Sequence, residues 1–408
     1  MAEITIDRLG RQGDGIASDL RVPFTLPGEL VRFEDVDHPE TVEIVIASPT
    51  RVAPVCPHFG ACGGCTLQHA SDAFLANWKT DIVRKALEAR GLEAPLRAIA
   101  VSPPHSRRRA LFAGSRTRKT VRIGFHKRRS EDIVDIASCD VIRPEIHSAL
   151  SALSALSALR ALAGLGASRS AGVRLAVTCG PSGLDVAVMD AKPLDAALQS
   201  RLAGLAETHD LARLTWDDEL VALRRPPFQS MGSTQVIPPP GAFLQATVEG
   251  ETALVGAVRE AVGGAARIAD LFSGCGTFAL PLAETAEVHA VEGAPDMLVA
   301  LDAAWRGANG LRRVMTEQRD LMRRPLLAEE LDPFSAVVID PPRAGAEAQA
   351  RNLASSSVSR VASVSCDPAT FARDASILVA GGFRLDWVQP VDQFRWTGHV
   401  EIAAQFTR

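Results

Sequence analysis

The sequence predicts an α/β protein in three parts: a small N-terminal β-barrel, an α+β central region, and a C-terminal Rossmann-like domain built around a doubly wound parallel sheet. Three observations carry this prediction. Short alternating apolar runs fill residues 1–50, strands and helices mix over 51–240, and helices alternate regularly with strands over 241–408. The boundary near 240 lies in a Pro-Pro-Pro-Gly run at 238–241, which interrupts regular structure.

The composition is that of a globular protein with a substantial core. The 408 residues are 47% hydrophobic and 23% charged, which excludes a disordered chain or a fibre. No apolar run reaches the ~18–20 residues that span a bilayer, and the first residues lack an apolar secretory segment. We therefore expect a cytoplasmic protein without membrane association. In that setting seven cysteines, an odd number, indicate metal or catalytic sites and not disulfides.

The N-terminal barrel is predicted from alternation and turns. Residues 4–6, 30–33 and 41–46 alternate apolar and polar side chains, as half-buried strands do, and glycines at 10–15 supply a turn. Residues 1–50 carry 4 basic and 10 acidic side chains. This balance makes the segment a poor surface for a polyanion.

A cysteine cluster opens the central region. Cys56, Cys62 and Cys65 lie close together, and Cys139 follows further on. Four soft thiolates suit zinc or an iron–sulfur cluster, and inert thiols are the alternative. Zinc sites more often use two closely spaced pairs, and only Cys62 and Cys65 form one, but the residues alone leave both zinc and a cluster open. Residues 73–90, which come next, have the periodicity of a helix with one apolar face.

Residues 107–129 form a basic stretch. They include ten lysines and arginines and no acid, within a chain whose net charge is −4. This concentration favours nucleic-acid binding over a merely solvated face, because phosphate contacts dominate such affinity. Phe112 and Phe125 either stack on bases or are buried. We expect charge reversal at 107–109 to weaken binding more than the same change elsewhere.

A glycine-rich loop follows the first predicted strand of the C-terminal domain. Gly274 and Gly276 lie between a strand that contains Asp270 and a helix, where a tight turn lets the backbone approach a ligand. Glu292 comes 22 residues after Asp270, at the end of the next strand, and a carboxylate there can accept both hydroxyls of a ribose. The pattern favours a nucleotide-type ligand over glycines that merely pack a helix. NAD and S-adenosylmethionine both fit it.

Further motifs put reactive side chains at strand ends. An Asp-Pro-Pro-Arg run at 340–343 ends one strand, and its prolines hold the loop rigid against a planar substrate. Cys366 ends another, in a turn marked by the Asp-Pro that follows it. This position favours a nucleophile over a small buried thiol. Glu401, in a His-Val-Glu run, supplies a carboxylate that could act as a base.

Together, the motifs DLFSGCGTFALPLA, DPPRAG, VSCDPATFARD and GHVE resemble those of the S-adenosylmethionine-dependent RNA 5-methyluridine methyltransferases, the RlmD/RlmC/TrmA family. The resemblance covers most of the chain. It implies a class I methyltransferase domain that methylates uridine C5 in RNA, with Cys366 as the nucleophile that adds to C6 and Glu401 as the base. It also assigns six residues to the S-adenosylmethionine site: Gln245, Phe272, Thr277, Glu292, Asp320 and Asp340.

The resemblance extends to the other two regions. It implies a TRAM-like fold for the N-terminal barrel and packing of helix 73–90 on the methyltransferase domain. It also implies a [4Fe-4S] cluster, held by Cys56, Cys62, Cys65 and Cys139. The cluster and the barrel are typical of the RlmD-like branch, so 23S rRNA is the expected substrate and tRNA the alternative. We expect a monomer.

Three residues, at two places in the chain, depart from the family pattern. Asp367 stands where Asn is usual, and Ala246-Thr247 stand where Val-Asn are usual. An extra carboxylate beside Cys366 should raise the pKa of its thiol.

Two other classes of function are open at this point. One is a non-catalytic RNA-binding iron–sulfur protein with a vestigial cofactor site, although Cys366 and Glu401 are both intact. The other is an NAD-dependent enzyme, which NAD and not S-adenosylmethionine would stabilise against heat.

Overall fold

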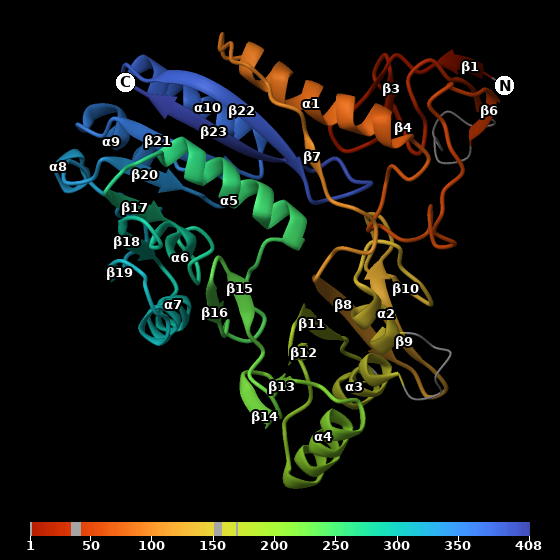
Figure 1. Cartoon of the computed structure of the whole chain (residues 1–408). Coiled ribbons are helices and arrows are strands. Elements are labelled where there is room, and N and C mark those ends of the chain that lie inside the picture. The colour runs from red at the N-terminus through yellow and green to blue at the C-terminus, as the bar shows by residue number, and fades with distance from the viewer. Residues whose placement is uncertain (1, 34–41, 151–156, 169) are drawn as a thin grey trace.

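The computed structural model describes residues 2–33, 42–150, 157–168 and 170–408. Figure 1 shows three groups of elements: small sheets near the N-terminus, a central sheet with its helices, and a large sheet flanked by helices near the C-terminus. The boundaries at residues 50 and 240 stay predictions. Within the described ranges, no helix is both long and apolar enough to cross a membrane.

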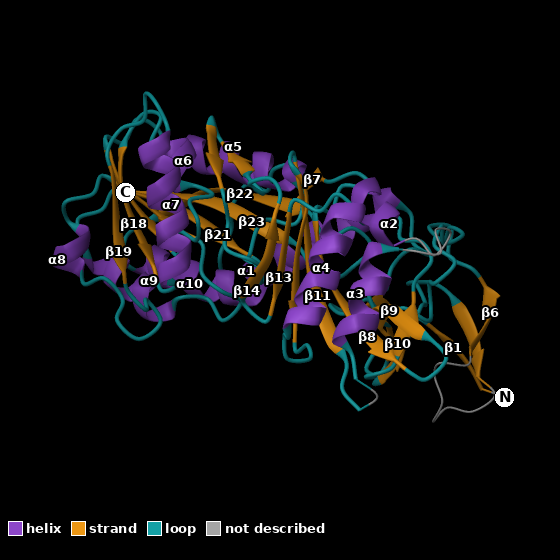
Figure 2. Ribbon diagram, turned by 90° about the horizontal axis from the view of Figure 1, so that it is seen from below, coloured by secondary structure: helices purple, strands orange, loops and turns teal. Residues whose placement is uncertain are grey.

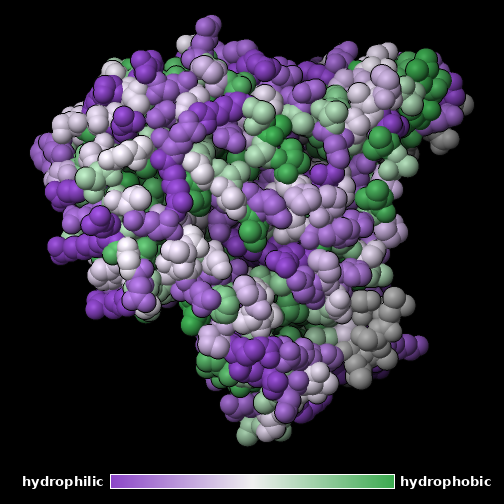
Figure 3. All heavy atoms as spheres, in the orientation of Figure 1, coloured by the Kyte–Doolittle hydropathy of each residue, from purple (hydrophilic) through white to green (hydrophobic). Residues whose placement is uncertain are grey.

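Two three-stranded antiparallel sheets form the N-terminal part. One has the order β1 (Ala2–Thr5), β5 (Leu30–Phe33), β6 (Val42–Ile46), and the other β2 (Arg8–Leu9), β3 (Gly15–Ala17), β4 (Leu20–Val22). They share a core in which Val22, Val31 and Phe33 are at most 1% exposed. Hydrophobic side chains also gather outside, over β1 and β6 (Figure 3), where Ile46 is 57% exposed.

The central sheet has seven strands, antiparallel except for one pair. Its order is β10 (Ile133–Asp135), β9 (Val121–His126), β8 (Arg109–Arg116), β11 (Val173–Gly180), β12 (Gly183–Met189), β13 (Arg213–Trp216), β14 (Glu219–Leu223). Helices α2 (Pro144–Leu150), α3 (Ala158–Gly166) and α4 (Ala196–Thr208) accompany it. A Ser-Ala-Leu repeat at 148–159 predicts a buried helix, but residues 151–156 lie outside the described part. The flanking Leu150 and Leu159 are fully buried.

The structure bears on two expectations for the basic stretch. Phe112 is fully buried and stacks on Phe125 with ring centroids 5.0 Å apart, so Phe112 is a core residue and not a platform for bases. Arg108 is 2% exposed, forms an ion pair with Glu251, and donates from Nε to the Gln245 carbonyl at 3.1 Å. Charge reversal at Arg108 would therefore disrupt the fold before it affected a bound polyanion.

The C-terminal sheet has eight strands. Its order is β19 (Val314–Gln318), β18 (Glu287–Glu292), β17 (Arg267–Leu271), β20 (Ala336–Ile339), β21 (Arg360–Ser365), β23 (Glu401–Thr407), β22 (Arg384–Asp392), β7 (Ala100–Val101). The first five strands are parallel, and β23 is antiparallel to both neighbours. The chain order reverses between β17 and β20, and open α/β sheets bind ligands at such a point.

Helices cover both faces of this sheet (Figure 2). One core contains α5 (Val248–Val262), α6 (Ala279–Leu282) and α7 (Pro295–Gly307), and the other α1 (Asp72–Glu88), α8 (Ala328–Leu331), α9 (Glu347–Ser355) and α10 (Pro368–Ala380). Ile268 and Ala269 of β17 point into opposite cores, as the two-residue period of a strand requires. A hairpin of β15 (Gln229–Met231) and β16 (Thr234–Val236) precedes α5.

Helix α1 packs on the C-terminal sheet although it lies early in the chain. Val83 and Leu87 are buried in the same core as α10. Lys79 is fully buried. Its Nζ forms an ion pair with Oδ1 of Asp392 at 2.6 Å and donates to the Phe394 carbonyl at 3.1 Å. Apolar packing and one buried cation therefore hold α1 against this sheet.

Candidate active site

The candidate site lies at the carboxyl ends of the parallel strands. The glycine loop with Phe272 and Thr277 follows β17, and three predicted cofactor residues end or follow the neighbouring strands: Glu292 on β18, Asp320 after β19 and Asp340 after β20. Because parallel strands end at a common edge, residues far apart in the sequence meet there.

The glycine loop requires unusual backbone conformations. Gly274 and Gly276 have φ of 55° and 100°, and Phe272 also has a positive φ of 63°. A side chain at Gly276 would meet Leu280 at 2.9 Å, whereas space at Gly274 is open. Strained non-glycine backbone is concentrated at ligand sites, which marks this loop as a functional element.

Glu292 is fixed over this loop. One carboxylate oxygen accepts from the Gly274 amide at 3.0 Å, and the other from the Gly293 and Ala294 amides at 2.7 and 2.9 Å. The contact between Glu292 and a ribose stays a prediction. Asp320 is exposed, and its carboxylate accepts from the Met322 amide at 3.1 Å.

Sequence reasoning noted Asp270 as the acid before the glycine loop but gave it no role in the site. It is fully buried, and neither carboxylate oxygen has a hydrogen-bond partner among the described residues. Burial, together with Asp340 and Glu292 nearby, raises its pKa well above the usual value. Burial also raises the pKa of Asp340 to about 7. A buried carboxyl group without a partner, next to the glycine loop, is typical of a site that awaits a polar or cationic ligand.

The β21–β23 ladder brings Cys366 and Glu401 together. Ser365 pairs with Ile402 at the end of the antiparallel ladder, so Cys366, which follows Ser365, and Glu401, which precedes Ile402, lie near each other. Burial raises the pKa of the Cys366 thiol to about 11, and Glu401 and Asp340 add to this shift. Glu401 is 4% exposed, and burial and Asp340 raise its pKa to about 8.

Gln393 connects Glu401 to Gln245. Its Nε2 donates to the Gln245 side-chain oxygen at 2.5 Å, and its Oε1 accepts from the Ala246 amide at 2.8 Å. A hydrogen bond with Gln393 opposes the rise in the pKa of Glu401. Sequence reasoning did not select Gln393, although it follows β22 beside the strand that carries Glu401.

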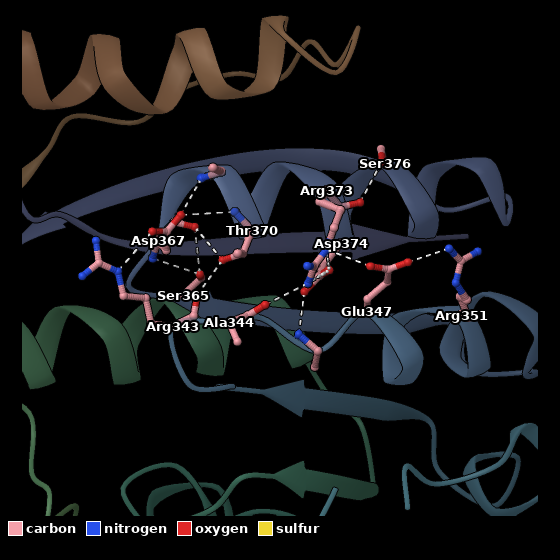
Figure 4. A network of polar contacts seen from close by, with 12 residues as sticks. Arg343, Ala344, Glu347, Arg351, Ser365, Asp367, Thr370, Arg373, Asp374 and Ser376 are labelled. Atoms are coloured by element: carbon pink, nitrogen blue, oxygen red, sulfur yellow. Dashed lines mark hydrogen bonds and ion pairs between the residues drawn. The ribbon is translucent and has the colours of Figure 1, made fainter. Parts of the chain in front are cut away.

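Asp367 caps helix α10 and pairs with two arginines. Its carboxylate accepts from the Ala369 and Thr370 amides at 2.9 and 3.2 Å and forms ion pairs with Arg11 and, at 3.4 Å, Arg343. Figure 4 shows Arg343 and Asp367 pointing toward each other. Burial opposes ionisation, but these hydrogen bonds and Arg11 hold the pKa of Asp367 below its usual value. Asp367 raises the thiol pKa of Cys366 as expected, by less than burial, Glu401 and Asp340 do.

The four predicted cluster ligands surround one cavity. Cys56, Cys62, Cys65 and Cys139 all line a space of about 270 Å³. Burial raises the pKa of all four thiols, that of Cys65 to about 12. Within the described ranges, no three His, Cys, Asp or Glu side chains converge closely enough to hold one metal ion. The iron–sulfur cluster stays a prediction.

A larger cavity of about 1060 Å³ opens beside the nucleophile loop. It is lined by seven arginines and only two aspartates: Arg8, Arg11, Arg21, Arg107, Arg128, Arg129 and Arg343, with Asp14 and Asp19. His399, two residues before Glu401, lines it as well. Three of the arginines come from the N-terminal part of the chain, which is acidic overall. The net charge of this part therefore does not predict the charge of the face that it turns toward the cavity.

The whole fold resembles that of a solved methyltransferase. The tRNA (uracil-54, C5)-methyltransferase of Pyrococcus abyssi, solved in complex with S-adenosyl-L-homocysteine, matches with a TM-score of 0.78. The identity is 24%, and the match covers 99% of each chain. At this identity the likeness defines the fold class alone: an α/β methyltransferase fold.

Sequence relatives define the family. An uncharacterised RNA methyltransferase of Brucella suis is 44% identical, over 100% of this chain and 98% of its own length. The 23S rRNA (uracil(1939)-C(5))-methyltransferase RlmD of Chromohalobacter salexigens is 34% identical, over 99% of this chain and 89% of its own length. The profile of the tRNA (Uracil-5-)-methyltransferase family matches residues 240–408. The chain therefore belongs to the RNA uracil-C5 methyltransferases.

Proposed function

We propose that this enzyme uses S-adenosylmethionine to methylate C5 of a uridine in RNA through a covalent bond between Cys366 and C6. One observation carries the proposal: the end of the β21–β23 ladder brings Cys366 and Glu401 close enough for Glu401 to raise the pKa of the Cys366 thiol, at the edge where the glycine loop lies. Uracil C5 is a weak nucleophile until C6 is attacked. A thiol beside a base suits this substitution.

In the proposed reaction, the Cys366 thiolate bonds to C6 and an electron pair moves to C5. C5 then takes the methyl group, which S-adenosylmethionine supplies from its sulfonium. The Glu401 carboxylate removes the C5 proton, the C5–C6 double bond re-forms and the C6–S bond breaks, which restores the thiolate. Cys366 lies just before α10, and the dipole of a helix N-terminus favours the thiolate form.

The methyl donor is assigned to the glycine loop and the neighbouring strand ends. Phe272 and Thr277 would border it, Glu292 and Asp320 would bind its polar groups, and Asp340 and Gln245 would lie toward the reacting carbon. The positive φ values of the loop and the open space at Gly274 support this assignment. The unpartnered carboxyl group of Asp270 supports a polar or cationic ligand here.

For the RNA, we favour 23S rRNA. The RlmD relative, which is named for that substrate, aligns along 99% of this chain, including the N-terminal sheets and the cysteine cavity. A tRNA is the second candidate, because the matching family profile and the Pyrococcus abyssi enzyme are named for tRNA.

We also propose that the cysteine cavity holds a [4Fe-4S] cluster. The donor set fits, because each thiolate would bind a different iron around a cavity, and no convergence on one point is needed. The Gly64 amide donates to the Cys62 sulfur at 3.4 Å. Gly63 donates to the His126 carbonyl at 2.9 Å, so the cysteine loop anchors the end of β9 that leads to Arg128. The cluster would stabilise this RNA-facing loop.

The deciding experiment is Cys366→Ala. Wild-type enzyme with S-adenosylmethionine should form 5-methyluridine in transcripts of 23S rRNA, and mapping the product against tRNA should identify the substrate. The variant should bind RNA and lose methylation and the covalent complex. Methylation by Cys366→Ala would disprove the nucleophile assignment. Thermal stabilisation of the wild type by NAD, and not by S-adenosylmethionine, would disprove the proposed donor.

A further inference from the structure

A second basic groove lies between the β8–β9 turn and the helices α3 and α4, in the lower part of Figure 1. Its volume is about 670 Å³, and Arg116, Arg118 and Lys119 of the turn line it together with Arg201 of α4. Among the described residues, none that lines it is acidic or aromatic. Arg118, Lys119 and Arg201 are exposed.

These cations differ from several other arginines of the central region. Arg160, Arg174 and Arg225 form ion pairs with Asp135, Asp190 and Asp210 respectively. Within the part of the chain that the structure describes, no carboxylate lies within ion-pair distance of the four groove cations, a property that they share with exposed Arg122 of β9. An unneutralised group of like charges in a protein of net charge −4 is a specific feature of this surface.

The turn that carries Arg118 and Lys119 is ordered by its own hydrogen bonds. The Thr117 amide donates to the Thr120 carbonyl at 2.8 Å, and the Thr117 hydroxyl accepts from the Lys119 and Thr120 amides at 3.2 and 3.0 Å. Arg116 donates to the Gly164 carbonyl at 3.0 Å and so fastens the turn to α3. A turn held in this way presents its two charged side chains without further ordering of the backbone.

Strand β9 links this groove to the arginine cavity beside the active site. The groove lies at one end of the β8–β9 hairpin, and Arg128 and Arg129, which line the large cavity, follow the other end. Six residues at about 3.3 Å each separate the two basic regions by roughly 20 Å. Exposed Arg122 lies on β9 between them. Six of the ten cations of the basic stretch therefore divide between two sites: Arg116, Arg118 and Lys119 line the groove, and Arg107, Arg128 and Arg129 line the large cavity.

We propose that this distal groove binds the ribose–phosphate backbone of the RNA whose uridine enters the active site. The inference rests on the proposed function and extends it, because it requires an RNA that reaches well beyond the modified nucleotide. Cations without aromatic neighbours suit phosphates and not bases, so the contact would position the RNA without reading its sequence.

The test is the double variant Arg118→Glu with Lys119→Glu. For a structured transcript that extends several helical turns beyond the target, Kd should rise roughly tenfold, and the slope of log K against log salt should fall by about 0.7–0.9 for each phosphate that the variant no longer binds. For a short hairpin that carries only the target loop, Kd and kcat should stay as in wild type. Arg201→Glu, on the other wall, should give the same pattern.

Arg312→Glu with Arg313→Glu is the matched control, because these adjacent arginines are exposed and lie before β19, on the sheet edge away from the hairpin. Equal effects of both double variants, or an unchanged Kd for the long transcript, would overturn the proposal. So would competition for the groove by polyglutamate and not by RNA. If the wild type instead fails to methylate any uridine while still binding the long transcript through the groove, the proposed function fails and the groove assignment stands.

Discussion

At the residue scale, Asp367 shows how a departure from the family pattern is accommodated. A carboxylate next to a nucleophilic thiol opposes formation of the thiolate. Here the Asp367 carboxylate accepts hydrogen bonds from amides of α10 and forms ion pairs with Arg11 and Arg343. These partners offset its negative charge near the Cys366 sulfur. Burial and Glu401 raise the pKa of Cys366 more than Asp367 does. Asp367 therefore adds little to the rise in the thiol pKa that burial and Glu401 already cause.

The base can be tested at the same scale by Glu401→Gln. This change should lower kcat about 10²–10⁴-fold and leave a covalent RNA–protein complex, because the C5 proton is no longer removed. With a pKa of about 8, the Glu401 carboxylate becomes more populated as pH rises, so wild-type kcat should increase with pH through that value. Glu287→Gln, at the exposed start of β18, is the control. A Glu401→Gln variant that retains this pH dependence would contradict the assignment.

At the scale of elements, local sequence patterns predicted individual helices, strands and loops, whereas contacts between distant segments could not be predicted. The period of residues 73–90 predicts a helix, and α1 spans Asp72–Glu88. The glycine loop and the strand ends are also visible locally. By contrast, Arg11 reaches Asp367 from 356 positions away, and the buried ion pair of Arg108 with Glu251 spans 143 positions. No periodicity encodes such contacts, which depend on how whole sheets pack.

Helix α1 offers a test of one such contact. Lys79→Met should destabilise the protein by about 3–5 kcal/mol, because it leaves Asp392 buried without its cation. Lys85→Met, on the exposed side of the same helix, should change stability by less than about 0.5 kcal/mol. Urea unfolding followed by circular dichroism measures both. Equal stability of the two variants would show that the buried pair is not holding α1 on the sheet.

At the scale of the whole molecule, the three parts of the chain meet around the arginine cavity. Arg11 comes from the N-terminal sheets, Arg128 from the central sheet and Arg343 from the C-terminal sheet. The sequence predicted one basic stretch in the centre, because charge counted along a chain does not show which faces turn toward each other. The surface offered to RNA is therefore a property of the assembled molecule.

The proposed cluster can be tested on the intact protein. Enzyme purified without oxygen should be brown and contain iron, and Cys62→Ala should lose both the colour and the iron. Cys179→Ala is the control, because Cys179 is buried in the same region and does not line the cavity. A colourless wild-type protein that contains zinc would contradict the cluster.

The β21–β23 register also has a consequence for folding. Cys366 directly follows β21 and Glu401 begins β23, which lies between β21 and β22 in the finished sheet. Pairings between distant segments form slowly. Cys366 and Glu401 therefore come together only where β23 has paired with β21, so a variant that weakens this pairing should impair the nucleophile and the base together.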